Sequence, residues 1–477
     1  MVRYYELASR DEPPAMEAPS ADGSPPLSGR LRRLLSAFSL RRNAAKILDT
    51  RTVPGDIGCM YGIRALSVVW ITLLHSDNMA SVEHPFMMTL SELRWWPLTI
   101  LGPTLVPDTF LLLSATLVSY NHFRGVARAG AGAPRGAGFW LKRLVKRYWR
   151  LTPPHMAVVW VLAVGLSWHY GNSPFWPTDR RAGLEPGCDP FWWRNLLLVH
   201  NLFPHAEMCI DQTWYLAVEW QLFLVTPPLL VLLERSVAAG TLLLTALMAS
   251  AAGLNLALAI WYDFVGEMLA VLQSGMPANN QAFRDVTYDK PYIRSVGYLL
   301  GLLLGRLLCH LQHEAAPDSR LRRVSDALSA RRGLAAASTA IALLLMALGM
   351  GLLPTTGLVP RALVFVHIGV ARSLWCLGVA WIILSGARGF GGVVDRFLSW
   401  GFFKPLGRLT YCMYLLHPLL LAMFWSNLET QSYPSASLMV AVVIAASVVS
   451  FGAAFLWSLL FEMPHLDLMR MLVDGKW

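Results

Sequence analysis

The sequence predicts an all-α polytopic membrane protein with about ten transmembrane helices and both termini in the cytosol. Of its 477 residues 55% are hydrophobic and only 15% are charged, and the mean hydropathy is +0.45. These values lie far from the average of soluble domains, and the apolar residues form long blocks without helical or strand alternation. Because a helix needs about 20 residues to cross a bilayer, the expected spans are 59–80, 98–120, 152–169, 211–233, 241–262, 291–311, 333–353, 361–385, 405–427 and 436–461.

The first expected span carries an ionisable residue near each end, Arg64 and His75. Its apolar core, 68–74, is too short to cross a bilayer, so the span includes both polar residues. They lie roughly 16 Å apart along a helix axis and point the same way. An ionisable residue at that depth is costly and indicates a functional site. The alternative is a histidine that caps an ordinary helix, and the stretch alone favours that reading.

Asp108 stands near the start of the second span, on the side of the membrane where the first span ends. It is therefore a candidate partner for His75. A carboxylate that fixes the tautomer of an imidazole leaves the other ring nitrogen free to accept a hydroxyl proton, as a general base does. The alternative, equally well supported, is a helix N-cap.

Arg147 and Arg150 precede the third span, which opens with two prolines, residues that a first helical turn tolerates. Residues three apart share a helix face, and paired guanidinium groups suit phosphate or carboxylate. The alternative is a basic loop that contacts anionic headgroups. That reading explains the preceding lysines but not the preference for arginine at the end of the run.

The fourth span opens with Trp214, Tyr215 and Glu219, which give one side of the helix a polar and aromatic character. A helix that merely crosses lipid has no need of Glu219, so burial against protein is expected. Arg372, in the middle of the eighth span, carries the same implication. An unpaired buried charge is unstable, and we expect Arg372 to pair with a buried carboxylate, Glu219 first among them.

Two further spans carry recognisable patterns. Gly297, Gly301 and Gly305 form two overlapping small-xxx-small steps in the sixth span, which predict close helix approach. The ninth span contains Tyr411, Tyr414 and His417. We interpret His417 as structural, since nothing acidic lies near it in the sequence.

The net charge of +10 is concentrated in alternate loops, chiefly 28–51, 121–150 and 312–332. The positive-inside rule places those loops in the cytosol. The basic residues therefore indicate membrane lipids, and not nucleic acid, as partners.

Three parts are expected along the chain: a cytosolic tail at 1–56, mostly disordered with a basic segment, a transmembrane domain at 57–465 and a short cytosolic tail at 466–477. The first 56 residues hold no apolar stretch behind a basic start, so no cleavable signal peptide is expected and the first span acts as the insertion signal.

Cys188 and Cys209 share one loop on the non-cytosolic side, where an oxidising compartment favours a disulfide. The alternative is two unpaired thiols. The other four cysteines fall in or beside spans. No CxxC or His/Cys ligand spacing is present, so we expect no metal site.

The ordered set of motifs resembles the nose-resistant-to-fluoxetine branch of the acyltransferase 3 family. The matching residues are 38–43 (FSLRRN), 62–67 (GIRALS) with His75, 107–110 (PDTF), 147–153 (RYWRLTP), 213–217 (TWYLA), 290–292 (KPY), Tyr298 with Gly301 and Gly305, 409–418 (LTYCMYLLHP) and 461–464 (FEMP).

This resemblance implies a ten-helix membrane core that transfers an acyl group, typically from acyl-CoA, to a hydroxyl on a lipid or other acceptor, with no bound cofactor. The family's essential histidine corresponds to His75, and its paired arginines to Arg147 and Arg150. Glu219 stands where relatives usually have Asp. With Asp108 as partner of His75, the expected substrate-binding residues are Arg64, Arg147, Arg150, Trp214, Tyr215, Glu219 and Arg372.

A carrier of lipids or small hydrophobic molecules is the rival interpretation. Transporters commonly show two related halves or interrupted helices at corresponding positions, and we find no convincing internal repeat. The basic, arginine-paired cytosolic side suits an acyl-CoA head better than an apolar cargo. We expect a multi-pass protein of the endoplasmic reticulum or the plasma membrane.

Overall fold

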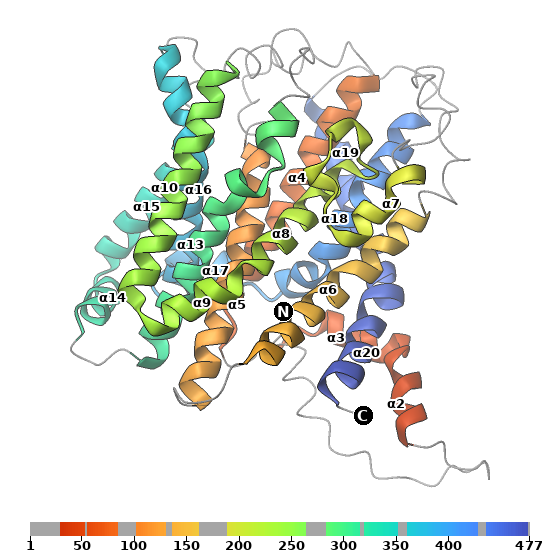
Figure 1. Cartoon of the computed structure of the whole chain (residues 1–477), viewed down its shortest axis with the longest axis horizontal. Helices are drawn as coiled ribbons and strands as arrows, with labels where there is room; N and C mark the ends of the chain where they lie inside the picture. The colour runs from red at the N-terminus through yellow and green to blue at the C-terminus, as the bar shows by residue number, and fades with distance from the viewer. Residues whose placement is uncertain are drawn as a thin grey trace.

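The computed structural model describes nine stretches of the chain, which are 29–52, 55–83, 102–129, 136–161, 188–263, 283–314, 319–351, 360–427 and 436–475. The regular elements in these stretches are helical. Their long helices run side by side in one bundle (Figure 1). They are α4 (Cys59–Glu83), α5 (Val106–Ala129), α6 (Ala137–Trp160), α10 (Val237–Trp261), α13 (Pro291–Cys309), α15 (Arg332–Gly349), α16 (Arg361–Arg388), α18 (Phe403–Ser426) and α19 (Ala436–Trp457).

Shorter helices connect and cap the bundle. They are α2 (Gly29–Ala37), α3 (Leu40–Leu48), α7 (Cys188–Leu197), α8 (Trp214–Leu224), α9 (Thr226–Arg235), α14 (Arg320–Ala330), α17 (Gly392–Leu398) and α20 (Met463–Asp474). Single turns include η3 (Gly102–Leu105), η8 (Asp211–Thr213), η9 (Arg284–Tyr288) and η12 (Ser458–Glu462).

Seven helical segments among the described residues are long and apolar enough to cross a membrane, and α8 with α9, bent by 41°, makes an eighth if the two form one span. The protein is therefore a multi-pass membrane protein. Two of the ten expected spans differ from this set. Span 98–120 falls largely on α5, whose ends carry polar residues, and span 152–169 begins in α6 and then leaves the described residues.

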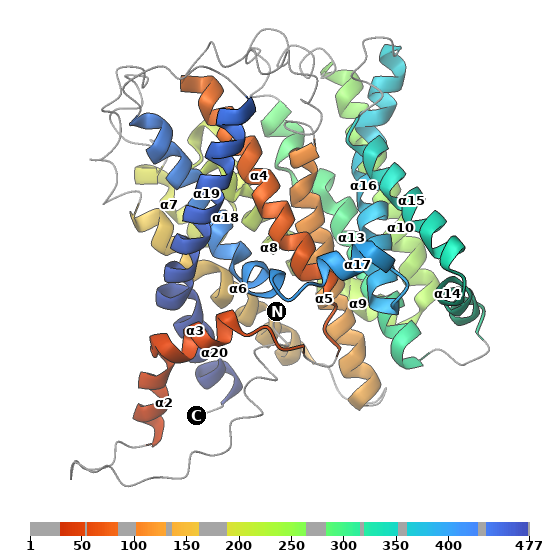
Figure 2. The same ribbon diagram turned by 180° about the vertical axis from the view of Figure 1, so that it is seen from behind.

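The exposed apolar residues lie where a lipid-facing surface is expected. Large hydrophobic side chains are exposed along α10, α15, α16 and α19, for example Leu242, Ile341, Leu363 and Val448. Helices α10, α15 and α16 gather at one end of the bundle, whereas α4, α18 and α19 pack together nearer the other end (Figure 2).

Most buried hydrophobic residues of the described stretches belong to two large clusters. One includes residues of α5, α8, α9, α13 and α16, and the other includes residues of α4, α6, α18 and the end of α19. Four aromatic side chains pack against both clusters, namely Trp70, Phe110, Tyr215 and Trp220. The seam between the two clusters is therefore lined by aromatic rings from α4, α5 and α8.

Helices α5 and α13 pack closely because the three glycines of α13 face α5. A Cβ atom on Gly297, Gly301 or Gly305 would lie 2.7, 2.5 or 2.4 Å from the backbone carbonyl oxygen of Asp108, Leu112 or Thr116. These distances are too short for real carbon atoms, so only glycine allows this approach. The prediction of close helix packing is confirmed for all three glycines.

The segment 38–52 is anchored to the bundle. Lys46 forms an ion pair of 2.9 Å with Asp467 of α20, and the Arg408 guanidinium of α18 donates to the carbonyl oxygens of Lys46 and Ile47 at 3.1 and 2.8 Å. The end of the expected N-terminal tail thus forms helix α3 against the transmembrane domain.

Candidate active site

Helix α4 carries two of the predicted site residues, Arg64 and His75, and both side chains are partly buried. The helix is continuous from Cys59 to Glu83, so the two residues lie roughly 16 Å apart along its axis at 1.5 Å per residue. Helix α18 packs along α4. The surroundings of the two residues are therefore set mainly by α18.

His75 lies against His417 of α18. Its Nδ1 atom is 2.8 Å from Nε2 of His417, and the two rings are nearly parallel, with an interplanar angle of 3°. His417 is fully buried. From the sequence we interpreted His417 as structural, because no acidic residue is near it in the chain. The contact with His75 was not predicted, since it depends on the pairing of α4 with α18.

Asp108 does not bond to His75, contrary to the pairing that we predicted. Its Oδ2 atom accepts a hydrogen bond of 2.6 Å from Arg294 of α13 and lies 3.5 Å from Nε of Arg372 on α16. Asp108 and Arg294 are both completely buried, and a buried carboxylate needs a close cation. The glycine-mediated packing of α13 on α5 brings Arg294 to this carboxylate.

Trp214 lies beside Arg294, the partner of Asp108. The Arg294 guanidinium lies 4.8 Å from the Trp214 ring centroid and 4.7 Å from that of Tyr288, distances that favour cation–π attraction. Arg294 was not among the residues predicted from the sequence. The sequence feature that could have indicated Arg294 is an arginine inside the sixth span, three residues before Gly297.

Glu219 pairs with Arg147 and not with Arg372, which corrects a second expected ion pair. The Arg147 guanidinium donates to Glu219 and to the Ser114 hydroxyl, and the side chains of Arg147 and Glu219 are 15% and 8% exposed. Arg147 lies on α6, whose approach to α8 and α5 no local sequence pattern specifies. Arg372 finds its carboxylate in Asp108 instead.

Three further predicted residues, Arg64, Arg150 and Tyr215, lie near this Arg147–Glu219 ion pair. Arg64 interacts electrostatically with Arg150, Tyr215 and Glu219, so residues from α4, α6 and α8 form one polar cluster. We call Arg64, Arg147, Arg150, Tyr215 and Glu219 the arginine cluster. The structure brings these five predicted residues together.

A row of aromatic rings links the arginine cluster to the histidine pair. The ring centroids of Tyr215 and Tyr414 are 5.7 Å apart, and those of Tyr414 and His417 are 6.2 Å apart. Tyr414 donates from its hydroxyl to the Gln212 carbonyl. A continuous row of tyrosine and histidine rings therefore connects Tyr215 with His417 and His75.

Asp211 and Arg284 lie near the histidine pair. They form an ion pair with each other, and both interact electrostatically with His75. Sequence reasoning did not select either residue. Arg284 belongs to η9, which reaches this place only through the tertiary fold.

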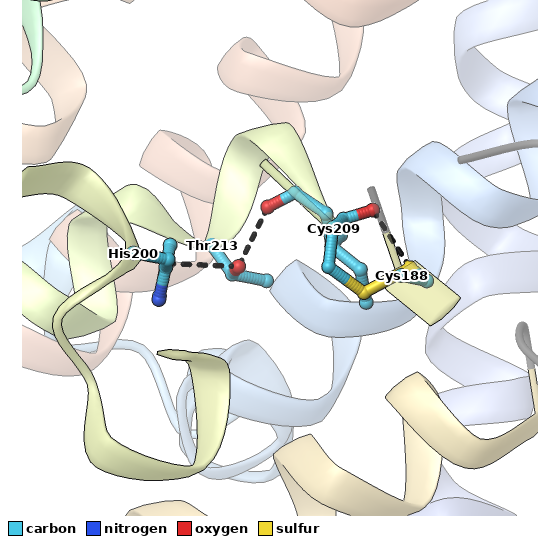
Figure 3. The surroundings of a disulfide bond; sticks show 5 residues. Cys188, His200, Cys209 and Thr213 are labelled. Carbon is cyan, nitrogen blue, oxygen red and sulfur yellow. Dashed lines mark hydrogen bonds between the residues drawn. A yellow bond between two sulfur atoms is a disulfide. The ribbon is translucent and has the colours of Figure 1, made fainter. Parts of the chain in front are cut away.

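Cys188 and Cys209 form a disulfide with an S–S distance of 2.04 Å, the pairing that the sequence analysis favoured. The bond joins the start of α7 to the segment before η8, close to His200 and Thr213 (Figure 3). Burial lowers the pKa of His200 to about 4, so its ring is neutral at pH 7. The Thr213 hydroxyl, 3.2 Å from Nε2 of His200, is also bonded to the Ile210 carbonyl. Within the part of the chain that the structure describes, no group of three His, Cys, Asp or Glu residues is arranged to hold a metal ion.

The helical bundle, with charged residues in its interior, is that of a multi-pass membrane protein. Residues 58–461 match the family model of an acyltransferase domain, so the chain belongs to the acyltransferase 3 family. The chain is 27% identical over 465 residues to nose resistant to fluoxetine protein 6 of Caenorhabditis elegans, an alignment that covers 93% of this chain and 55% of that protein. The chain thus spans about half the length of the curated relative that it matches. No solved structure matches it.

Proposed function

We propose that this protein transfers an acyl group from acyl-CoA to a hydroxyl of a lipid or other acceptor, with His75 as the general base. The observation that carries the proposal is the line of polar and aromatic side chains from the arginine cluster through Tyr215 and Tyr414 to His75. It lies in the seam of a chain that belongs to an acyltransferase family.

The two ends of this line suit the two ends of an acyl-CoA. Guanidinium groups bind phosphates through charge-assisted hydrogen bonds, and an imidazole takes a proton from an attacking hydroxyl. The hydroxyl oxygen forms a bond to the thioester carbon, its proton passes to His75, the carbon–sulfur bond breaks, and the proton leaves with the CoA thiol. The products are an ester and free CoA.

Arg64 and Arg150 are the better candidates for phosphate contact. The charge of Arg147 is already matched by Glu219, and a phosphate would have to compete with that carboxylate. We assign Arg147 and Glu219 the role of holding α6 and α8 in register, so that Arg150 is presented beside Arg64. We assign Asp108, with Arg294 and Arg372, the role of holding α5, α13 and α16 together.

The proposed topology places the arginine cluster on the cytosolic side, where CoA is available, and the Cys188–Cys209 disulfide on the oxidising side. Both termini then face the cytosol. The compartments that fit are the endoplasmic reticulum and the plasma membrane.

Turnover by purified protein tests this proposal. Detergent-solubilised protein is incubated with isotope-labelled acetyl-CoA or palmitoyl-CoA and a total lipid extract, and esters are followed by mass spectrometry. We expect labelled ester and free CoA in equal amounts, lost in His75→Ala by roughly 10²–10⁴-fold in rate.

A well-folded wild type that releases no CoA with either donor, or a His75→Ala variant with full activity, would contradict the proposal. Lipid that exchanges between protein and vesicles without ester formation would favour the carrier function instead. His465→Ala, which alters a histidine of α20 outside the seam, is the matched control and keeps full activity.

A further inference from the structure

His417 has both ring nitrogens engaged, and its two neighbours determine which nitrogen carries the proton. Nδ1 of His417 is 3.0 Å from the backbone carbonyl oxygen of Met413, and Nε2 is 2.8 Å from Nδ1 of His75. A carbonyl oxygen only accepts hydrogen bonds. Nδ1 of His417 is therefore the N–H donor, and in the neutral ring Nε2 is an acceptor.

This tautomer fixes that of His75. Because Nε2 of His417 accepts, Nδ1 of His75 carries the proton, and the lone pair of His75 is on Nε2. We infer that His417 is a positioning residue that holds His75 in the tautomer whose Nε2 accepts the proton of the acceptor hydroxyl. The inference rests on the proposed function and gives His417 the place in which a carboxylate was expected.

The same contact also stabilises the charge that forms during transfer. When the hydroxyl proton moves to Nε2 of His75, the ring becomes an imidazolium, and its Nδ1–H still points at the Nε2 lone pair of His417. The hydrogen bond then becomes charge-assisted and roughly twice as strong as its neutral form. His417 therefore contributes to the transition state more than to the binding of substrates, and its loss lowers kcat and leaves KM nearly unchanged.

The position of His417 is fixed from several directions. Its ring is completely buried. It lies 6.2 Å, between ring centroids, from Tyr414, whose hydroxyl donates to the Gln212 carbonyl. Earlier on α18, the Cys412 thiol lies 3.3 Å from Oε2 of Glu462. A ring held in this way offers Nε2 in one orientation, which is what the control of a tautomer requires.

Two amide substitutions separate the two contacts of the ring. An asparagine amide reaches about as far as Nδ1 and keeps the bond to Met413, whereas a glutamine amide extends about as far as Nε2 and offers its oxygen to His75. We expect His417→Asn to lower kcat by roughly 10²-fold and His417→Gln to retain at least about a third of it, with KM changed by less than about threefold in both. His465→Asn is the matched control, because Nδ1 of His465 lies 2.6 Å from the carbonyl oxygen of Phe461 and this ring lies outside the seam.

Each outcome decides the inference. In a protein whose wild type is active and whose His75→Ala variant is not, equal kcat values for His417→Asn and wild type overturn the positioning role and leave the proposed function standing. A wild type without transferase activity overturns both.

The double variant His75→Ala with His417→Asn is expected to lose no more activity than His75→Ala alone, since the effects of residues that act as a unit are not additive. Thermal melts test whether each variant is folded. If His417→Asn does not fold, His417→Gln is compared with wild type instead, and a loss of kcat above tenfold then contradicts the inference.

Discussion

At the residue scale, the buried ion pair of Arg147 with Glu219 is expected to stabilise the fold. Removing one partner leaves an uncompensated buried charge, so Arg147→Ala should reduce the free energy of unfolding by about 3–5 kcal/mol. The double variant Arg147→Met with Glu219→Gln leaves no such charge and should regain most of that loss. Thermal unfolding of the two variants in detergent measures the difference, and equal melting temperatures would contradict the ion pair.

Arg150 differs from Arg147 in that its proposed partner is the donor substrate. Loss of a charge-assisted hydrogen bond of about 1.5–3 kcal/mol weakens CoA binding by about one to two powers of ten. We expect this for Arg150→Ala, and little recovery in Arg150→Lys, because an ammonium lacks the planar fork. Calorimetric titration of CoA into the solubilised protein measures it. Arg128→Ala, at the exposed end of α5, is the control with unchanged affinity, and an equal affinity for Arg150→Ala would remove Arg150 from the donor site.

The sequence identified most residues of the candidate site but fewer of their partners. Arg64, His75, Glu219 and Arg372 are visible because an ionisable group inside an apolar stretch is conspicuous. Their partners depend on which helices pack together, and the sequence alone does not fix that. Asp108 therefore pairs with Arg294 and not with His75, and the residue that contacts His75 is His417.

At the scale of elements, the contact of α13 with α5 gives the clearest test of packing. A methyl group on Gly301 would lie 2.5 Å from the Leu112 carbonyl oxygen, so Gly301→Ala has to force the two helices apart. We expect a loss of roughly 1–3 kcal/mol. Gly253→Ala is the matched control within α10, since nothing lies within 4 Å of its added carbon, and it should be neutral or stabilising by about 0.4–1 kcal/mol. Thermal melts compare the two, and equal effects would contradict the close approach.

The helices themselves were largely predictable, because long apolar blocks admit little else in a membrane. The small-xxx-small pattern correctly indicated a tightly packed face on α13. Hydropathy alone did not distinguish a helix with polar ends, such as α5, from a lipid-facing helix such as α10. The first contributes its polar residues to the interior, whereas the second exposes Leu242 to the surroundings.

At the scale of the whole molecule, the Cys188–Cys209 disulfide reports on topology as well as stability. Peptide mapping without reductant should recover the two cysteines linked. Breaking this crosslink, which joins residues 21 apart, should cost roughly 3 kcal/mol in the chain-entropy model. The double variant Cys188→Ser with Cys209→Ser should melt lower than wild type and should not respond to reductant. Two free, alkylatable thiols in wild type would contradict both the bond and the side of the membrane assigned to this segment.

Helix α4 places the proposed phosphate contact and the general base on one rigid rod. The separation of Arg64 and His75 then acts as a ruler for the donor, because an uninterrupted helix neither stretches nor bends easily over eleven residues. An acyl thioester on a truncated arm can touch the base or the arginines but not both at once. Such a donor forfeits the effective concentration that anchoring one end provides to the other, so in the proposed reaction the rate depends on the length of the carrier as well as on the identity of the acyl group.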